Sequence, residues 1–145
     1  MGNRAVITTK HEEKNNGVGV YLHWNGGIES IEAFLAYCEI KKFRCPEDDN
    51  YGWAYLCTVI GNYFGDGLSL GIDKLERLDT DNGDNGVYYI EDWKVIGRSY
   101  NAPLSTDGGE MYERLVGINE SQGPSVRVDN EVIKQYCEDK GFPTD

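Results

Sequence analysis

The order in which strand and helix patterns follow one another constrains this chain most. Runs rich in β-branched and aromatic residues predict strands at residues 4–9, 18–24, 68–72, 87–90 and 93–100. Apolar residues at helical spacing predict helices at about 28–41, 53–64, 110–120 and 130–140. Strands and helices occur in groups and do not alternate one for one, so parallel βαβ units are not expected. We therefore expect an α+β fold, with about four helices packed on an antiparallel sheet of about five strands.

The first two strands are expected to pair as a hairpin, because an Asn-Asn-Gly turn signal precedes residue 18. The second strand alternates clearly between two sides. The side expected to face the core carries Val18, Val20, Leu22 and Trp24. The opposite side carries Gly19, Tyr21 and His23. A tight turn at residues 91–92 is expected to join the last two strands.

The predicted helices carry end signals that place their boundaries. Asp49 suits the N-cap of the second helix, and Gly65 suits its end. Asp107 and Glu110 resemble a capping box before the third helix, and Asp129 suits the N-cap of the fourth. With these elements spread over all 145 residues, we expect a single domain spanning residues 1–145.

Acidic residues dominate the charge of the chain. Asp and Glu number 25 against 14 Lys and Arg, and the formal net charge is -11. Non-specific nucleic-acid binding and binding to anionic membranes both need a positive field, so neither is expected. No apolar run reaches the length of a membrane span, and the first residues contain no signal-peptide core. These features predict a location in the cytoplasm, here that of a bacterial host.

The acids are concentrated in the chain, which suggests a binding surface. Residues 66–92 hold eight acids against two bases, and a shorter acidic run lies at residues 47–49. Exposed aromatic residues beside these acids could anchor a partner. Tyr88 and Tyr89 point to opposite sides of one strand, so one of them is expected to be exposed, and Tyr88 is the candidate. The predicted partner-binding residues are Glu47, Asp48, Asp49, Asp66, Asp73, Glu76, Asp79, Asp81, Asp84 and Tyr88.

A second candidate site is the strand-to-helix turn at residues 21–27. Free backbone N–H groups at a helix start can hold an anion, and glycines let a ligand approach closely. The residues of this predicted ligand site are Tyr21, His23, Asn25, Gly26 and Gly27. An ordinary turn with a packed Trp24 and a surface His23 explains the same pattern.

Three further motifs are incomplete. Residues 79–86 alternate acids with glycines like a calcium loop, but Gly83 stands where an EF-hand needs an oxygen ligand. Residues 67–71 match Gly-x-Ser-x-Gly, yet both histidines precede them, which the nucleophile elbow does not allow. The four cysteines lack zinc-site spacing, and only Cys45 is expected to be exposed. The sequence therefore assigns no metal, no cofactor and no catalytic residue.

Three segments, residues 3–7, 19–27 and 79–88, resemble a group of small proteins from phages and mobile elements of Gram-positive bacteria. The resemblance covers about residues 3–100. It implies a context in which compact acidic proteins block host defence, as anti-CRISPR proteins do, and it implies no catalytic residues.

Together these patterns predict a non-enzymatic binding protein. Its acidic surface would occupy the basic nucleic-acid-binding surface of a host protein, without binding nucleic acid or a membrane itself. The alternative is a small-ligand or nucleotide binder, or a small nucleotide-handling enzyme, that uses residues 21–27.

Overall fold

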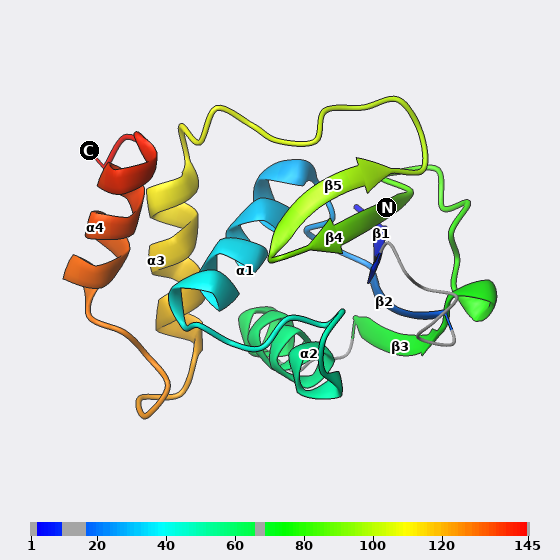
Figure 1. Ribbon diagram of the computed structural model, residues 1–145, viewed down its shortest axis with the longest axis horizontal. Coiled ribbons are helices and arrows are strands. Elements are labelled where there is room, and N and C mark those ends of the chain that lie inside the picture. The colour runs from blue at the N-terminus through cyan, green and yellow to red at the C-terminus, as the bar shows by residue number, and fades with distance from the viewer. Residues whose placement is uncertain (1–2, 10–16, 66–68, 145) are drawn as a thin grey trace.

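The computed structural model describes residues 3–9, 17–65 and 69–144. Five strands form one sheet in the order β3-β2-β1-β4-β5 (Figure 1). Their bounds are β1 Ala5–Thr9, β2 Val18–Leu22, β3 Leu70–Lys74, β4 Val87–Glu91 and β5 Lys94–Arg98. The α+β class and the β1–β2 hairpin are confirmed.

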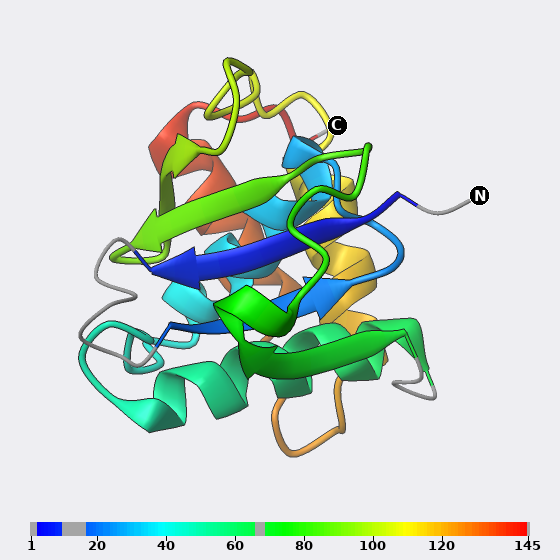
Figure 2. The same ribbon diagram turned by 90° about the vertical axis from the view of Figure 1, so that its right-hand side faces the viewer.

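The sheet is mixed and mostly antiparallel, because β1 and β4 run parallel to each other. After β3, a short 3-10 helix η1 (Leu75–Arg77) and the loop up to Gly86 lead back across the sheet to the start of β4. This crossing, seen in front of the sheet in Figure 2, lets β4 begin at the same end as β1. The sequence pattern predicted the strands, but it contains no signal for this return path.

Four helices cover one face of the sheet. They are α1 Ile28–Ile40, α2 Asn50–Phe64, α3 Met111–Ser121 and α4 Asn130–Lys140. Figure 1 shows α1 between the sheet and the α3–α4 pair. Helix α1 is therefore covered on opposite sides, and eight of its 13 residues are buried. The core forms where its apolar side chains meet those of the inner sheet face, among them Ile7, Leu22 and Tyr88.

The other face of the sheet, here called the outer face, is partly covered by η1 and the loop that follows it. Leu75 and Leu78 pack over Gly19, where a Cβ atom would lie 3.0 Å from Leu78 Cδ1. With cover on both faces, all five residues of β1 are buried. This cover brings residues 75–86 onto the outer face together with their acidic side chains.

Several local expectations need correction. Strand β2 ends at Leu22, and Trp24 is 43% exposed instead of packed in the core. The β4–β5 turn is made by Asp92 and Trp93, both with positive φ as in a type I′ turn, and not by residues 91–92. Trp93 tolerates this conformation because its indole is buried and its Nε1 donates to the Phe43 carbonyl at 2.9 Å.

The helix caps agree with expectation in part. Asp49 accepts a hydrogen bond from the Tyr51 amide, so it caps α2 as predicted. The expected capping box at Asp107 does not form, because its carboxylate accepts from the Gly109 amide two residues before α3 begins. Asp129 occupies the N-cap of α4 without a side-chain cap bond. No helix within the described ranges is both long and apolar enough to cross a membrane.

Candidate functional site

The two sites predicted from the sequence meet on the outer face. Tyr21 lies on β2 and His23 follows its end, and the Tyr21 hydroxyl lies 3.1 Å from His23 Nδ1. Arg4 immediately precedes β1. Its Nε lies 2.9 Å from Asp84 Oδ2, and its Nη1 lies 3.6 Å from Asp79 Oδ2. The hydrogen bond from Arg4 lowers the pKa of Asp84, while burial raises the pKa of Tyr21. The acidic loop thus lies beside the polar side of β2.

The loop at residues 79–86 is held in one shape by Asn82, whose side chain is 2% exposed. Its Nδ2 donates to the carbonyls of Asp79 and Gly86, and its Oδ1 accepts from the amides of Asp84 and Gly86. The Asp79 and Asp84 carboxylates both face the Arg4 guanidinium. Two of the carboxylates that a calcium ion would use are therefore directed toward a side-chain cation in this loop.

Most acids of this segment are exposed, including Asp79, whose contact with Arg4 is a loose 3.6 Å. Asp73 on β3, Glu76 on η1, and Asp79 and Asp81 in the loop are all exposed. Asp73 accepts from the Lys74 amide at 2.7 Å and lies 3.8 Å from Arg77, and Glu76 and Asp81 pair with no base in the described part of the chain. Asp66 lies outside the described residues. We call Asp73, Glu76, Asp79 and Asp81 the outer acidic group.

The acids at residues 47–49 belong to a different region, the loop between α1 and α2. Asp49 caps α2 and pairs with Arg44, and a Glu47 oxygen accepts from the Asp92 amide at 2.8 Å. Only Asp48 of the three is exposed. Glu47 and Asp49 therefore hold the loop and the β4–β5 turn in place, which leaves them less available to a partner than predicted.

Cys45 is half-buried beside this loop and not exposed as expected. Its sulfur and the carboxylates of Glu47 and Asp48 lie within 4.8 Å of one another, the one such group of three possible metal ligands among the residues described. Burial and then the neighbouring acids raise the pKa of the Cys45 thiol to about 11. The thiol is therefore protonated at neutral pH, and it would have to lose this proton to bind a metal.

Tyr88 is not available as a surface anchor, which corrects the expectation for this residue. Its side chain is 0% exposed, its hydroxyl donates to the Gly26 carbonyl at 2.7 Å, and the Arg98 guanidinium lies over its ring. The β1–β4 register explains this position, because Tyr88 lies opposite the core residue Ile7. Tyr89, on the other side of the strand, is the partly exposed member of the pair.

The turn at residues 21–27 does not offer an open anion site. The Gly26 amide already donates to the Asn3 carbonyl at 2.8 Å, and a Cβ atom on Gly26 would lie 2.5 Å from that oxygen. Gly27 is the N-cap of α1, and the Glu29 carboxylate lies 2.9 Å from the position of a Cβ on Gly27. A negative side chain thus occupies the helix end where an anion would bind. Asn25 has a positive φ of 58° and forms the bend.

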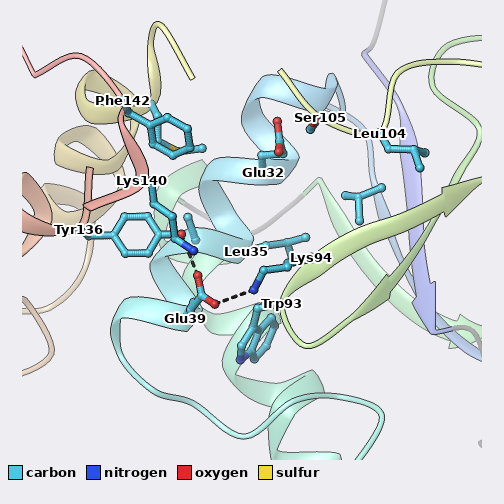
Figure 3. Close-up of a pocket in the computed structure, with 13 residues that line it drawn as sticks. Glu32, Leu35, Glu39, Trp93, Lys94, Leu104, Ser105, Tyr136, Lys140 and Phe142 are labelled. Atoms are coloured by element: carbon cyan, nitrogen blue, oxygen red, sulfur yellow. Dashed lines mark hydrogen bonds and ion pairs between the residues drawn. The ribbon is translucent and has the colours of Figure 1, made fainter. Parts of the chain in front are cut away.

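The structure also contains a cleft that the sequence did not predict. Its volume is about 240 Å³, and it opens between α1, the β4–β5 turn, the segment at 104–105 and the C-terminal end of α4 (Figure 3). Its charged and phenolic groups are Glu32, Glu39, Lys94, Tyr136 and Lys140. Glu32 and Glu39 are seven residues apart and so share one face of α1. This spacing was the only sequence signal, and the other members come from distant segments.

The two glutamates of the cleft have opposite environments. Glu39 accepts from Lys94 Nζ at 2.9 Å and from the Tyr136 hydroxyl at 2.8 Å. Burial alone would raise the pKa of Glu39, but these hydrogen bonds outweigh it and hold the pKa below its ordinary value. Glu32 accepts from the Thr106 amide at 2.7 Å, and burial raises its pKa. No lysine or arginine in the described ranges forms an ion pair with Glu32.

These shifts predict that glutamine substitutions act in opposite directions on stability. The lowered pKa of Glu39 stabilises the fold above the ordinary value of 4.5, and this contribution is lost as pH falls through the folded pKa. The raised pKa of Glu32 has the reverse effect: its contribution is full below 4.5 and is lost as pH rises through the folded pKa. At neutral pH, Glu39→Gln should therefore lower and Glu32→Gln raise the free energy of unfolding.

Urea unfolding of both variants at neutral pH and near pH 4 measures these differences. Both differences from the wild-type protein should shrink at the lower pH. The raised pKa of Glu32 leaves it mostly protonated there, and the contribution of Glu39 begins to be lost as pH falls below 4.5 toward its lowered folded pKa. A loss of equal size in both variants at neutral pH would contradict the assignment.

Two regions of the described chain thus assemble polar groups from separate segments: the outer face and the cleft beside α1. Comparisons with protein-family models, with curated proteins and with solved structures find no match for this chain. The function therefore has to be inferred from the chain's own residues.

Proposed function

We propose that this chain is a non-enzymatic binding protein that docks its outer acidic group onto the basic nucleic-acid-binding surface of another protein. The observation that carries the proposal is the placement of Asp73, Glu76, Asp79 and Asp81 along one continuous segment over the outer face. An inhibitor of a host defence nucleoprotein, carried by a phage or mobile element, would use such a surface to compete with nucleic acid.

The rigidity of this segment supports a role in recognition. The four hydrogen bonds of the Asn82 side chain fix the loop, and Asn85 Nδ2 ties it to the Arg4 carbonyl at 2.9 Å. A surface that is ordered before binding loses less conformational entropy when the complex forms. The exposed carboxylates therefore need little rearrangement to meet a partner.

The charge balance specifies the chemistry of the partner. A net charge of -11 repels nucleic acid and supports a protein with a positive surface as the partner. Complementary potentials speed the encounter and contribute to specificity, and added salt weakens both effects. Binding should therefore weaken as salt rises, and nucleic acid should displace the protein from its partner.

A triple variant that replaces three carboxylates of this group by neutral amides, Asp73→Asn/Glu76→Gln/Asp81→Asn, tests the proposal. The control is Glu120→Gln/Glu131→Gln/Glu138→Gln, which makes the same change in net charge at exposed positions on α3 and α4. Wild type and control should capture nucleic-acid-binding proteins from nuclease-treated bacterial lysate, as identified by mass spectrometry. The outer-face triple should capture at least about tenfold less, equivalent to about 1.4 kcal/mol of binding free energy.

Two further readouts decide the matter. Excess duplex DNA added to the wild-type complex should release the captured proteins, because both compete for one basic surface. Equal capture by both triple variants, or capture that neither DNA nor salt reduces, would refute docking through the outer acidic group.

A further inference from the structure

The cleft beside α1 has the form of a small ligand site. Its walls are mainly apolar and come from Leu35 on α1, Trp93 in the β4–β5 turn, Met111 at the start of α3 and Phe142 after α4 (Figure 3). At about 240 Å³ it is smaller than the sites of drug-sized ligands. The cleft lies on the helical side of the sheet, so a ligand there would not occupy the outer acidic group.

Within this cleft, Glu32 is the carboxylate that forms no ion pair with a described residue, whereas Glu39 pairs with Lys94. Its hydrogen bonds come from Thr106, and the Glu32 carboxylate lies among apolar walls. Glu39, on the same face of α1, already has Lys94 and Tyr136 as hydrogen-bond donors. A half-buried carboxylate without a cation is costly, so a ligand cation beside Glu32 would be favoured.

The opposite end of the cleft limits which cations fit. Lys94 and Lys140 gather around Glu39, and Lys140 Nζ lies 5.5 Å from the centre of the Tyr136 ring. Seven residues of helix separate Glu32 from Glu39, a rise of roughly 10 Å. A ligand with a second positive charge at its far end would meet these lysines. The cleft therefore suits a single charge with an apolar remainder.

We propose that the cleft binds a small organic monocation, a primary ammonium on an apolar or aromatic body. The ammonium pairs with the Glu32 carboxylate, and the body lies against Trp93, Leu35 and Phe142. Burial of the body among aromatic and aliphatic side chains supplies most of the affinity, and the charge supplies the orientation. The raised pKa of Glu32 agrees with this assignment, because burial leaves its negative charge uncompensated.

Phenethylammonium chloride is a suitable probe, since it joins one ammonium to one phenyl ring. Two related probes, 2-phenylethanol and the slightly larger 3-phenylpropionate, keep the ring and replace the cation by a neutral or a negative group. Cadaverine adds a second ammonium. Binding is followed by NMR of the Thr106 amide and the Trp93 indole N–H. Phenethylammonium should shift both signals saturably, and each other probe should bind at least about tenfold more weakly.

Glu32→Gln is the decisive variant, because its amide oxygen can still accept from the Thr106 amide while the negative charge is removed. It should weaken phenethylammonium binding by about tenfold or more. Glu113→Gln, an exposed position on α3, makes the same change in net charge and should leave binding unchanged. The outer-face triple variant should also leave it unchanged, which separates this site from the proposed docking surface.

Three outcomes would overturn the inference. These are no saturable shift with phenethylammonium, equal affinity for 2-phenylethanol, or wild-type affinity in Glu32→Gln with the Thr106 and Trp93 signals otherwise unperturbed. The last outcome would place the cation elsewhere on the acidic surface.

Discussion

Replacing Asn119 with leucine is expected to lower the free energy of unfolding by about 4 kcal/mol. Asn119 is 4% exposed, and its Oδ1 accepts from the Tyr37 hydroxyl at 2.8 Å and from the Val128 amide at 3.0 Å. Its Nδ2 donates to the Val128 carbonyl at 2.8 Å. One side chain thus joins α1, α3 and the segment before α4. Leucine would leave three polar groups without partners, one of them the hydroxyl of the fully buried Tyr37.

A double-mutant cycle with Tyr37→Phe separates this effect from a simple change of shape. Phenylalanine removes the hydroxyl that leucine would leave unpaired, so the double variant should lose less stability than the sum of the two single variants. Urea unfolding monitored by circular dichroism gives all three values. Strict additivity, or a loss below about 1 kcal/mol for Asn119→Leu, would show that the network contributes little.

Gly26→Ala is expected to cost about 3 kcal/mol or more, because the added methyl group has no space. The new Cβ would lie 2.5 Å from the Asn3 carbonyl oxygen and 2.7 Å from Ala5 Cβ, so the start of β1 would have to move. That movement would also disturb the Gly26 carbonyl, which accepts from the buried Tyr88 hydroxyl. Thermal unfolding of the variant measures the cost.

Gly71→Ala is the matched control, since a Cβ on Gly71 in β3 meets nothing within 4 Å. Its stability should remain close to that of the wild-type protein. If Gly26→Ala were equally harmless, packing against the start of β1 would not require glycine at this position.

Local structure was predictable wherever one short segment determines it. The cap at Asp49, the end of α2 at Gly65 and the first hairpin follow from neighbouring residues alone. The parallel pairing of β1 with β4 does not, because it depends on a loop that returns across the sheet. Tyr88 and Tyr89 had the same appearance in the sequence, and only the β1–β4 register decides which of them is buried.

The candidate sites were likewise predictable only where their residues lie close together in the sequence. Asp73, Glu76 and Asp81 could be predicted as an acidic surface because they are close in the chain and polar. The pairing of Arg4 with Asp84 joins residues 80 positions apart, so no local pattern predicts it. Glu32 and Glu39 gain their opposite environments from Thr106, Lys94 and Tyr136, all of which the fold brings from other segments.

The position of α1 between the sheet and the α3–α4 pair has a consequence for how the chain is made. While the ribosome has synthesised only the first hundred residues, the far side of α1 lacks its cover, and the Tyr37 hydroxyl lacks Asn119. The nascent chain would therefore expose apolar surface until α3 emerges. Completion of this layer, and resistance to cellular proteases with it, therefore waits for the synthesis of α3 and α4.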